Sequence, residues 1–334
     1  MKKQGKLGIV LMSILILAMF LSACGSDSKS ESTDESTKTE TSTGAADEQP
    51  ATDEATEKVV TDAMGHEVTI PANPQKVLAS YLEDHLATLG VKPVAQWSVA
   101  NGIQDYLQAS GLEGVPTIGY DLPVEQVASF APDLIIIGSE SSVQNDLYDQ
   151  YSKIAPTYVL GDAINNDWRA ALTKIGELLN KSDEVTTALA AYDAKAADVK
   201  AKLAASAADQ SAAVLWFVSN TFYIVDETKA SGSILYNDLG VKIPNVVAEL
   251  PADQKANWNK ISLEKLADLD ADHIFLVNSD AAASETVKND AIWKNLKAVK
   301  AGNVYELPRS SSWLYSGDIA GQQIMDDVLK YMVK

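Results

Sequence analysis

Aromatic and charged side chains gather in a few polar segments of this chain of 334 residues. The clearest case is the run Arg309-Ser-Ser-Ser-Trp313-Leu-Tyr315, which follows an apolar run ending at Leu307. Core packing alone explains two aromatic residues poorly when three serines accompany them. Flat rings offer contact area, and a guanidinium group offers charge matching. This loop is therefore a candidate for contact with a bound molecule.

Other candidate contacts lie in or beside loops of the expected α/β architecture. Open α/β sheets bind ligands beyond the carboxyl ends of their strands, so such positions are expected to face a cleft. The expected ligand-binding set consists of Trp97, Tyr120, Phe222, Trp258, Arg309, Trp313 and Tyr315. Trp168, Trp216 and Trp293 are expected to be packing residues instead.

Catalytic motifs are missing from the sequence. It contains no Gly-x-Ser-x-Gly, no glycine-rich phosphate loop and no His-Glu-x-x-His, and we expect no enzymatic activity and no catalytic residue. A cell-surface hydrolase that uses scattered acids is the remote alternative. His85 stands beside Glu83 and Asp84, but adjacent positions do not share a helix face, so no metal site is expected there.

The N-terminus has the pattern of an export signal. Lys2, Lys3 and Lys6 precede an apolar run from Leu7 to Phe20, and Leu21-Ser-Ala-Cys24 follows. This last segment resembles the lipobox of bacterial lipoproteins, in which the cysteine carries lipid chains such as palmitate. Two acyl chains hold a protein stably on a membrane. We therefore expect a signal peptide over residues 1–23, lipidation of Cys24 and a location on the extracytoplasmic face of the cell membrane.

Residues 24–58 are expected to form a disordered acidic tether. They contain ten acids and three lysines and no aromatic or large aliphatic residue, so they cannot bury enough apolar surface to fold. The whole chain has a formal net charge of −19. Such a surface repels nucleic acid, which we exclude as a partner.

Short apolar runs alternate with helical stretches from residue 59 onward, a pattern typical of parallel α/β layers. A hairpin is expected first, with strands flanking Gly65. The other expected strands are 76–80, 93–97, 134–138, 157–160, 213–218, 222–225, 273–277 and 304–307.

One long helix is predicted over residues 182–206, where apolar residues recur every three to four positions and Ser182 is placed to cap the start. A similar helix-then-strand unit occurs on both sides of it, beginning at Glu125 and at Glu264. This repeat predicts two lobes, 59–181 and 207–334, with a ligand cleft between them.

Five segments in this order resemble the substrate-binding lipoproteins of iron–siderophore ABC importers. They are NPQKVLASYLEDHLATLGVKPVA (73–95), VEQVASFAPDLIII (124–137), GSILYNDLGVKIP (232–244), ISLEKLADLDADHIFLV (261–277) and WKNLKAVKAGNVYEL (293–307). The resemblance implies two Rossmann-like lobes joined by a rigid helix, and a ferric siderophore as the ligand. It also implies no cofactor and an ABC permease dimer as partner, with Glu125 and Glu264 as one docking contact on each lobe. We expect a monomer.

The ligand is expected to be a ferric hydroxamate. The sequence contains only two arginines, Arg169 and Arg309, whereas strongly anionic catecholate or citrate-type iron complexes usually require a cluster of cations. Hydroxamate complexes are near neutral or cationic and require aromatic surface with a few polar anchors. A catecholate, a citrate-type complex, haem and cobalamin stay open as alternative ligands.

Overall fold

A single long helix organises the fold. The computed structural model describes residues 56–100, 102–251 and 256–333, so the predicted signal peptide, Cys24 and nearly all of the tether lie outside the described residues. The long helix is α6 (Ser182–Ser206), with the bounds predicted from the sequence. Its buried positions form one stripe: Val185, Tyr192, Ala196, Val199 and Leu203. The capping prediction was wrong, because Lys181 is the N-cap residue and makes no side-chain cap.

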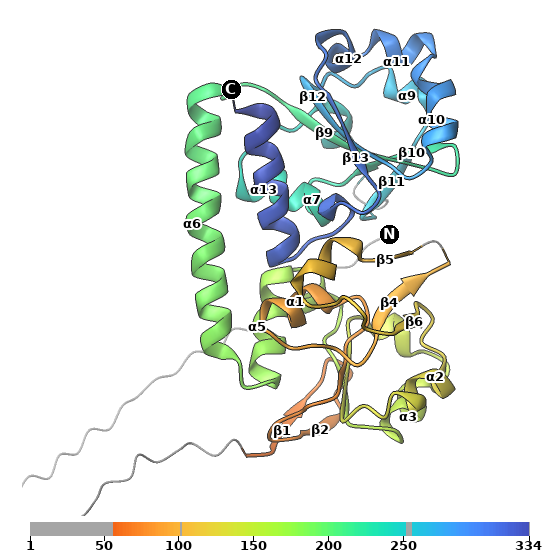
Figure 1. The fold of residues 1–334 in the computed structure, drawn as a ribbon, viewed down its shortest axis with the longest axis vertical. Helices are drawn as coiled ribbons and strands as arrows, with labels where there is room; N and C mark the ends of the chain where they lie inside the picture. Colours follow the sequence, from red (N-terminus) through yellow and green to blue (C-terminus); the bar gives the residue numbers. More distant parts are fainter. Residues whose placement is uncertain (1–55, 101, 252–255, 334) are drawn as a thin grey trace, which may run out of the picture. The chain divides into compact units, whose positions relative to one another are not determined.

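Before α6 the chain forms one lobe with short strands, shown in the lower part of Figure 1. An entry hairpin pairs β1 (Lys58–Thr61) with β2 (Glu67–Ile70). A parallel sheet of order β3-β7-β8 and a second sheet of order β5-β4-β6 follow. Their strands are β3 (Val77–Leu78), β4 (Gln96–Val99), β5 (Gly102–Ile103), β6 (Thr117–Gly119), β7 (Leu134–Ile137) and β8 (Thr157–Val159).

The helices of this lobe are mostly short. The helices α1 to α5 are Glu83–Thr88, Val124–Ser129, Leu147–Ser152, Asp162–Asn165 and Trp168–Leu178. Two 3-10 turns, η1 (Asp105–Ser110) and η2 (Glu140–Val143), complete it.

After α6 the chain forms a second lobe around one five-stranded sheet of order β11-β10-β9-β12-β13. The strands are β9 (Ala212–Val218), β10 (Thr221–Val225), β11 (Trp258–Ile261), β12 (His273–Asn278) and β13 (Val304–Pro308). Strand β12 runs parallel to both neighbours, whereas β10 is antiparallel to β9 and β11. The expected parallel layer is therefore mixed, because the two-residue turn after β9 folds the chain straight back. Every strand expected from the sequence overlaps an observed one.

The helical elements of this lobe include a π-helical turn, η3 (Ser233–Asp238), and a 3-10 turn, η5 (Ser312–Leu314). The helices α7 to α13 are Ala230–Gly232, Asn245–Ala248, Leu263–Leu266, Ala281–Lys288, Ala291–Asn295, Lys297–Ala301 and Asp318–Met332.

Helix α13 joins the two lobes together with α6. It packs along α6 and also contacts α1 of the first lobe (Figure 1). One hydrophobic cluster runs from Ile70 in the first lobe through Tyr192 of α6 to Ile324 of α13 and Phe275 in the second sheet. The lobe bounds 59–181 and 207–334 stay a prediction, because α13 belongs to neither side alone.

Candidate functional site

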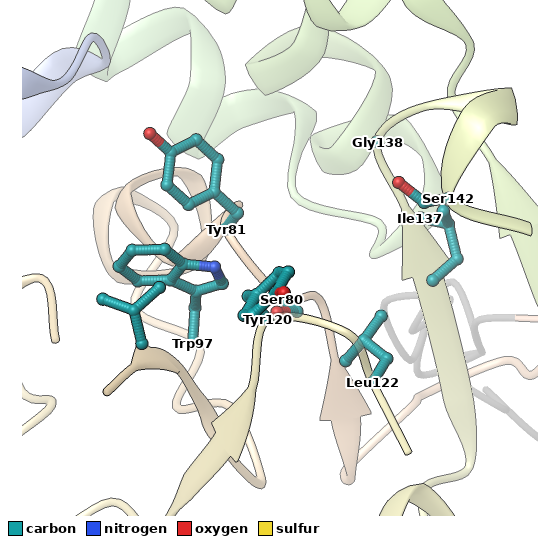
Figure 2. A pocket seen from close by; sticks show the side chains of 9 residues that line it. Ser80, Tyr81, Trp97, Tyr120, Leu122, Ile137, Gly138 and Ser142 are labelled. Atoms are coloured by element: carbon teal, nitrogen blue, oxygen red, sulfur yellow. The ribbon is translucent and has the colours of Figure 1, made fainter. Parts of the chain in front are cut away.

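A cavity of about 390 Å³ opens at the carboxyl ends of β3, β4, β6 and β7. Parallel strands place the residues that follow them at one edge of a sheet, where α/β proteins bind ligands. Figure 2 shows the rings of Tyr81, Trp97 and Tyr120 on one side of the cavity and Ile137 with Ser142 on the other. The lining is completed by Ser80, Val99, Leu122 and Gly138. We call this space the aromatic cavity.

Its rings are unusually open to solvent. Tyr120 is 69% exposed and Tyr81 is 47% exposed. The ring centroids of Tyr81 and Trp97 lie 5.0 Å apart in an edge-to-face arrangement. Large apolar side chains on a concave surface typically mark a binding site, since folding alone gains nothing by exposing them.

The backbone at Tyr81 is strained. Its φ angle is +66°, a left-handed conformation that few residues with a large side chain adopt. Strain of this kind concentrates at binding and catalytic sites, where surrounding contacts hold it in place. The left-handed turn ends the run that follows β3 and directs the ring of Tyr81 toward Trp97 (Figure 2).

The buried carboxyl group of Glu83 holds the backbone of Trp97 in place. Glu83 Oε1 accepts a hydrogen bond from the backbone N–H of Trp97 at 2.6 Å. Its Oε2 is buried and has no hydrogen-bond partner among the described residues. Burial raises the pKa of Glu83 to about 8, so the group is mainly uncharged at neutral pH. Through this hydrogen bond Glu83 stabilises the strand that carries Trp97, and it does so largely in the uncharged form.

The segment after β13 brings second-lobe residues to the first lobe. The Arg309 guanidinium lies 2.9 Å from the Asp105 carboxylate. The ring of Tyr315 stacks on that of Tyr106 at 5.0 Å, and its centroid is 6.1 Å from that of Tyr81. Two residues of the predicted ligand set, Arg309 and Tyr315, therefore reach the neighbourhood of the aromatic cavity.

Asp84 of the first lobe forms hydrogen bonds with the start of α13, which follows the same segment. Its carboxylate accepts hydrogen bonds from the backbone N–H groups of Ile319 and Ala320 at 3.1 and 3.0 Å, and from the Tyr106 hydroxyl at 3.0 Å. Asp84 is thereby a cap on α13 that is supplied by the other lobe. Gly317 has a φ of +146°, and a Cβ atom there would stand 2.4 Å from the Asp84 carboxylate. Burial raises the pKa of Asp84 to about 6.

The structure places the seven predicted contact residues in different environments. Trp97 and Tyr120 line the aromatic cavity, with Arg309 and Tyr315 close by. Trp258 does not lie in a loop, because it opens β11, where it contacts the Trp216 ring and its Nε1 donates to the Leu314 carbonyl at 3.4 Å.

Two other predicted contacts are buried. The Trp313 side chain is 0% exposed, stacks on Phe275 at 4.2 Å and donates to the Asp327 carboxylate. Phe222 is buried against Trp293, with ring centroids 5.3 Å apart. Their burial argues against contact with a ligand.

Tyr81 is the residue that the sequence reasoning missed. It follows β3 closely, so the rule that places ligand contacts after strands, which fits Tyr120 after β6, also selects Tyr81. Tyr81 stands directly after the predicted strand 76–80, and helix α1 begins at Glu83. Gly138, directly after β7, lines the cavity for the same reason.

Both arginines are already engaged by carboxylates. Arg169 lies 2.8 Å from Asp193 and 3.7 Å from Asp238. Its guanidinium also lies 4.6 Å from the ring centroids of Trp168 and Tyr192. Together with the Arg309 pair, this leaves the aromatic cavity with no unpaired guanidinium to offer an anionic ligand. In the described part of the chain, no group of three or more His, Cys, Asp or Glu side chains is placed to hold a metal ion.

Glu125 and Glu264 occupy matching positions. Each is exposed and lies in the first turn of a short helix, α2 or α9, ahead of a buried strand. Neither forms an ion pair with any residue that the structure describes. Of the helices that the structure describes, none has both the length and the apolar character needed to cross a bilayer.

Several known proteins are similar to this chain in sequence and in fold. The chain is 33% identical to the probable siderophore-binding lipoprotein YfiY of Bacillus subtilis, over 97% of this chain and 98% of that protein. It is 29% identical to the iron(3+)-hydroxamate-binding protein FhuD of the same organism, over 90% of each chain. The structure of Staphylococcus aureus SirA complexed with staphyloferrin B matches with a TM-score of 0.68 and 27% identity, covering 82% of this chain and 98% of SirA.

A two-lobed mixed α/β fold is thus common to this chain and to solved binding proteins. The relatives are solute-binding proteins, and the sequence prediction that this chain is not an enzyme agrees with them. Residues 79–310 match the family described as periplasmic binding protein, and the chain belongs to that family.

Proposed function

We propose that this protein is the substrate-binding lipoprotein of an ABC importer, that it captures a ferric siderophore of the hydroxamate type, and that it delivers this complex to a membrane permease. Similarity to YfiY, a probable siderophore-binding lipoprotein, and to FhuD, an iron(3+)-hydroxamate-binding protein, supports the siderophore part of the proposal. The observation that carries the hydroxamate part is the charge state of the site. The aromatic cavity presents open rings, while Arg169 and Arg309 are both paired with carboxylates.

The physical argument is one of charge matching. A trihydroxamate complex of Fe³⁺ has a neutral iron centre, so aromatic and aliphatic contacts can bind its organic shell without a cation cluster. A tricatecholate complex is a trianion, and burying it without unpaired cations would leave charge uncompensated. Anchoring through Cys24 belongs to the same proposal, since a lipid anchor holds the protein on the membrane that contains its permease.

Tryptophan fluorescence of the purified protein tests the ligand class. We expect ferric hydroxamates to quench this fluorescence. The quenching should saturate at a lower concentration of ferric hydroxamate than of ferric catecholate, ferric citrate or haem. Replacing Trp97 with alanine is expected to weaken hydroxamate binding more than tenfold, or about 1.4 kcal/mol.

Tyr223→Ala is the matched control for Trp97→Ala. Tyr223 is also half-buried on a strand and packs against a tryptophan, Trp216, but lies outside the aromatic cavity. Its removal is expected to leave hydroxamate affinity unchanged. The hydroxamate assignment would be overturned if a ferric catecholate, ferric citrate or haem quenched the fluorescence to saturation while ferric hydroxamates left it unchanged.

Delivery to the permease is tested separately. We expect Glu125→Ala combined with Glu264→Ala to abolish uptake of the iron complex by cells while its affinity for the purified protein stays unchanged. Both carboxylates are exposed and form no ion pair with the described residues, so they are available to cations of a partner.

Glu67→Ala combined with Glu113→Ala is the control for docking. These two glutamates are equally exposed and are expected to be dispensable. Normal uptake by the Glu125/Glu264 double variant would remove these residues from the docking surface.

A further inference from the structure

One arginine lies beside the aromatic cavity without lining it. Strand β5 pairs with β4 so that Gly102 stands opposite Val99, and Val99 lines the cavity. The Arg309 guanidinium packs directly on the backbone of Gly102, at a point where a Cβ atom would overlap it. Neighbouring strands lie about 4.8 Å apart. The guanidinium is therefore one strand away from the cavity wall, and a change of its rotamer would bring it to a ligand that fills the cavity.

Asp105 determines where this guanidinium lies. Arg309 Nη2 donates to Asp105 Oδ2 at 2.9 Å, and the two side chains are 33% and 32% exposed. Solvent and solutes can therefore reach the pair. A guanidinium in contact with a carboxylate presents almost no net charge to a third group, because the two opposite charges cancel beyond their immediate surroundings.

The other charged groups nearby do not replace Arg309. Among the described residues that line the aromatic cavity, none is charged. Glu83, which accepts from the Trp97 N–H, is mainly uncharged at neutral pH. Lys229 donates to the Asn166 amide oxygen at 2.9 Å, and it lines a second cavity of about 110 Å³ together with the Asp84 carboxylate. Arg309 is therefore the group through which this chain can adjust the charge that a ligand in the aromatic cavity meets.

We propose that Asp105 is a specificity-determining residue, which holds the Arg309 guanidinium away from the aromatic cavity and thereby disfavours strongly anionic iron complexes. A neutral trihydroxamate complex needs no guanidinium and is indifferent to the pair. A trianionic complex would have to draw Arg309 away from Asp105 and leave that carboxylate uncompensated. This inference rests on the proposed function, because it names the residue that excludes competing ligands from the same site.

Asp105→Asn tests the assignment, because asparagine keeps the shape of the side chain and removes its charge. We expect this variant to bind a ferric tricatecholate and ferric citrate about tenfold more tightly than the wild type does. Its affinity for a neutral ferric trihydroxamate is expected to stay nearly unchanged. Tryptophan fluorescence measures all three affinities. Adding Arg309→Gln to Asp105→Asn is expected to abolish the gain, and raising the salt concentration is expected to reduce it.

Asp121→Asn is the matched control. Asp121 directly follows Tyr120, is exposed, and forms no ion pair within the described part of the chain. Its replacement removes the same charge beside the cavity but releases no cation, so all three affinities are expected to stay close to those of the wild type. A partly exposed ion pair contributes little to stability, so Asp105→Asn is expected to fold. Asp105→Ala is a second variant with the same expected gain.

Two results would overturn the role of Asp105 and leave the proposed function standing. One is an unchanged affinity of both Asp105 variants for the two anionic complexes, and the other is a gain that survives Arg309→Gln. If the wild-type protein itself binds an anionic complex more tightly than the trihydroxamate, the proposed ligand class fails, and the role of Asp105 fails with it.

Discussion

Replacing Asp84 with alanine is expected to lower the free energy of unfolding by about 3 kcal/mol. The change removes the acceptor for two backbone N–H groups of α13 and for the Tyr106 hydroxyl, all within a buried interface. Each buried donor left without a partner costs about 1–3 kcal/mol. Urea unfolding followed by circular dichroism measures the loss.

Asp167→Ala is a closely matched control for this prediction. Asp167 also accepts two backbone N–H groups, from Arg169 and Ala170, but it caps α5 within one lobe and is exposed to solvent. Loss of such a cap costs about 1 kcal/mol. Equal losses of unfolding free energy in the two variants would show that Asp84 stabilises the protein only as an ordinary helix cap and that its burial between the lobes adds no further stability.

Ionisation of Glu83 is expected to make the protein markedly less stable as the pH rises. The pKa is about 8 in the folded protein against an ordinary value of 4.5, so the folded state holds the proton more firmly than the unfolded state. A raised pKa contributes stability that is fully present below pH 4.5 and is lost progressively up to pH 8. Between pH 5 and pH 8 the contribution of this group falls by about 3 kcal/mol.

Glu83→Gln isolates that contribution, because glutamine keeps an oxygen to accept the Trp97 N–H and cannot ionise. We expect the unfolding free energy of this variant to decline less steeply over the same pH range than that of the wild type. The exposed substitution Glu67→Gln is expected to leave the wild-type slope in place. If the unfolding free energies of Glu83→Gln and the wild type changed in parallel with pH, the buried carboxyl group would not be the source of the pH dependence.

Local patterns were sufficient to predict the main elements of the fold. The bounds of α6 follow from apolar spacing, and the strands follow from short apolar runs, because both signals depend on residues close together in the chain. The antiparallel strand β10 shows the limit of this reasoning. Alternating strands and helices indicate an α/β lobe but do not give the direction in which one strand pairs with the next.

The site was predicted less well, since side-chain burial depends on contacts distant in sequence. The serines around Trp313 indicated a solvent-exposed loop, yet a 3-10 turn at 312–314 directs the indole onto Phe275 in the core. Tyr120 was found because it directly follows a strand, β6, which is a local signal, whereas Trp97 lies within β4 and not after it. Neither the Asp84 cap nor the pairing of Arg309 with Asp105 leaves a signal in the sequence, because each joins residues more than 200 positions apart.

The cap on α13 has a consequence for the order in which this protein folds. Asp84 accepts hydrogen bonds from two N–H groups that lie 235 and 236 residues later in the chain. Contacts of such long range form slowly, because the entropy of closing the intervening loop must be overcome first. The first lobe therefore cannot complete its buried interface while α13 is still missing, and folding is expected to end in a late docking step that makes the two lobes one cooperative unit.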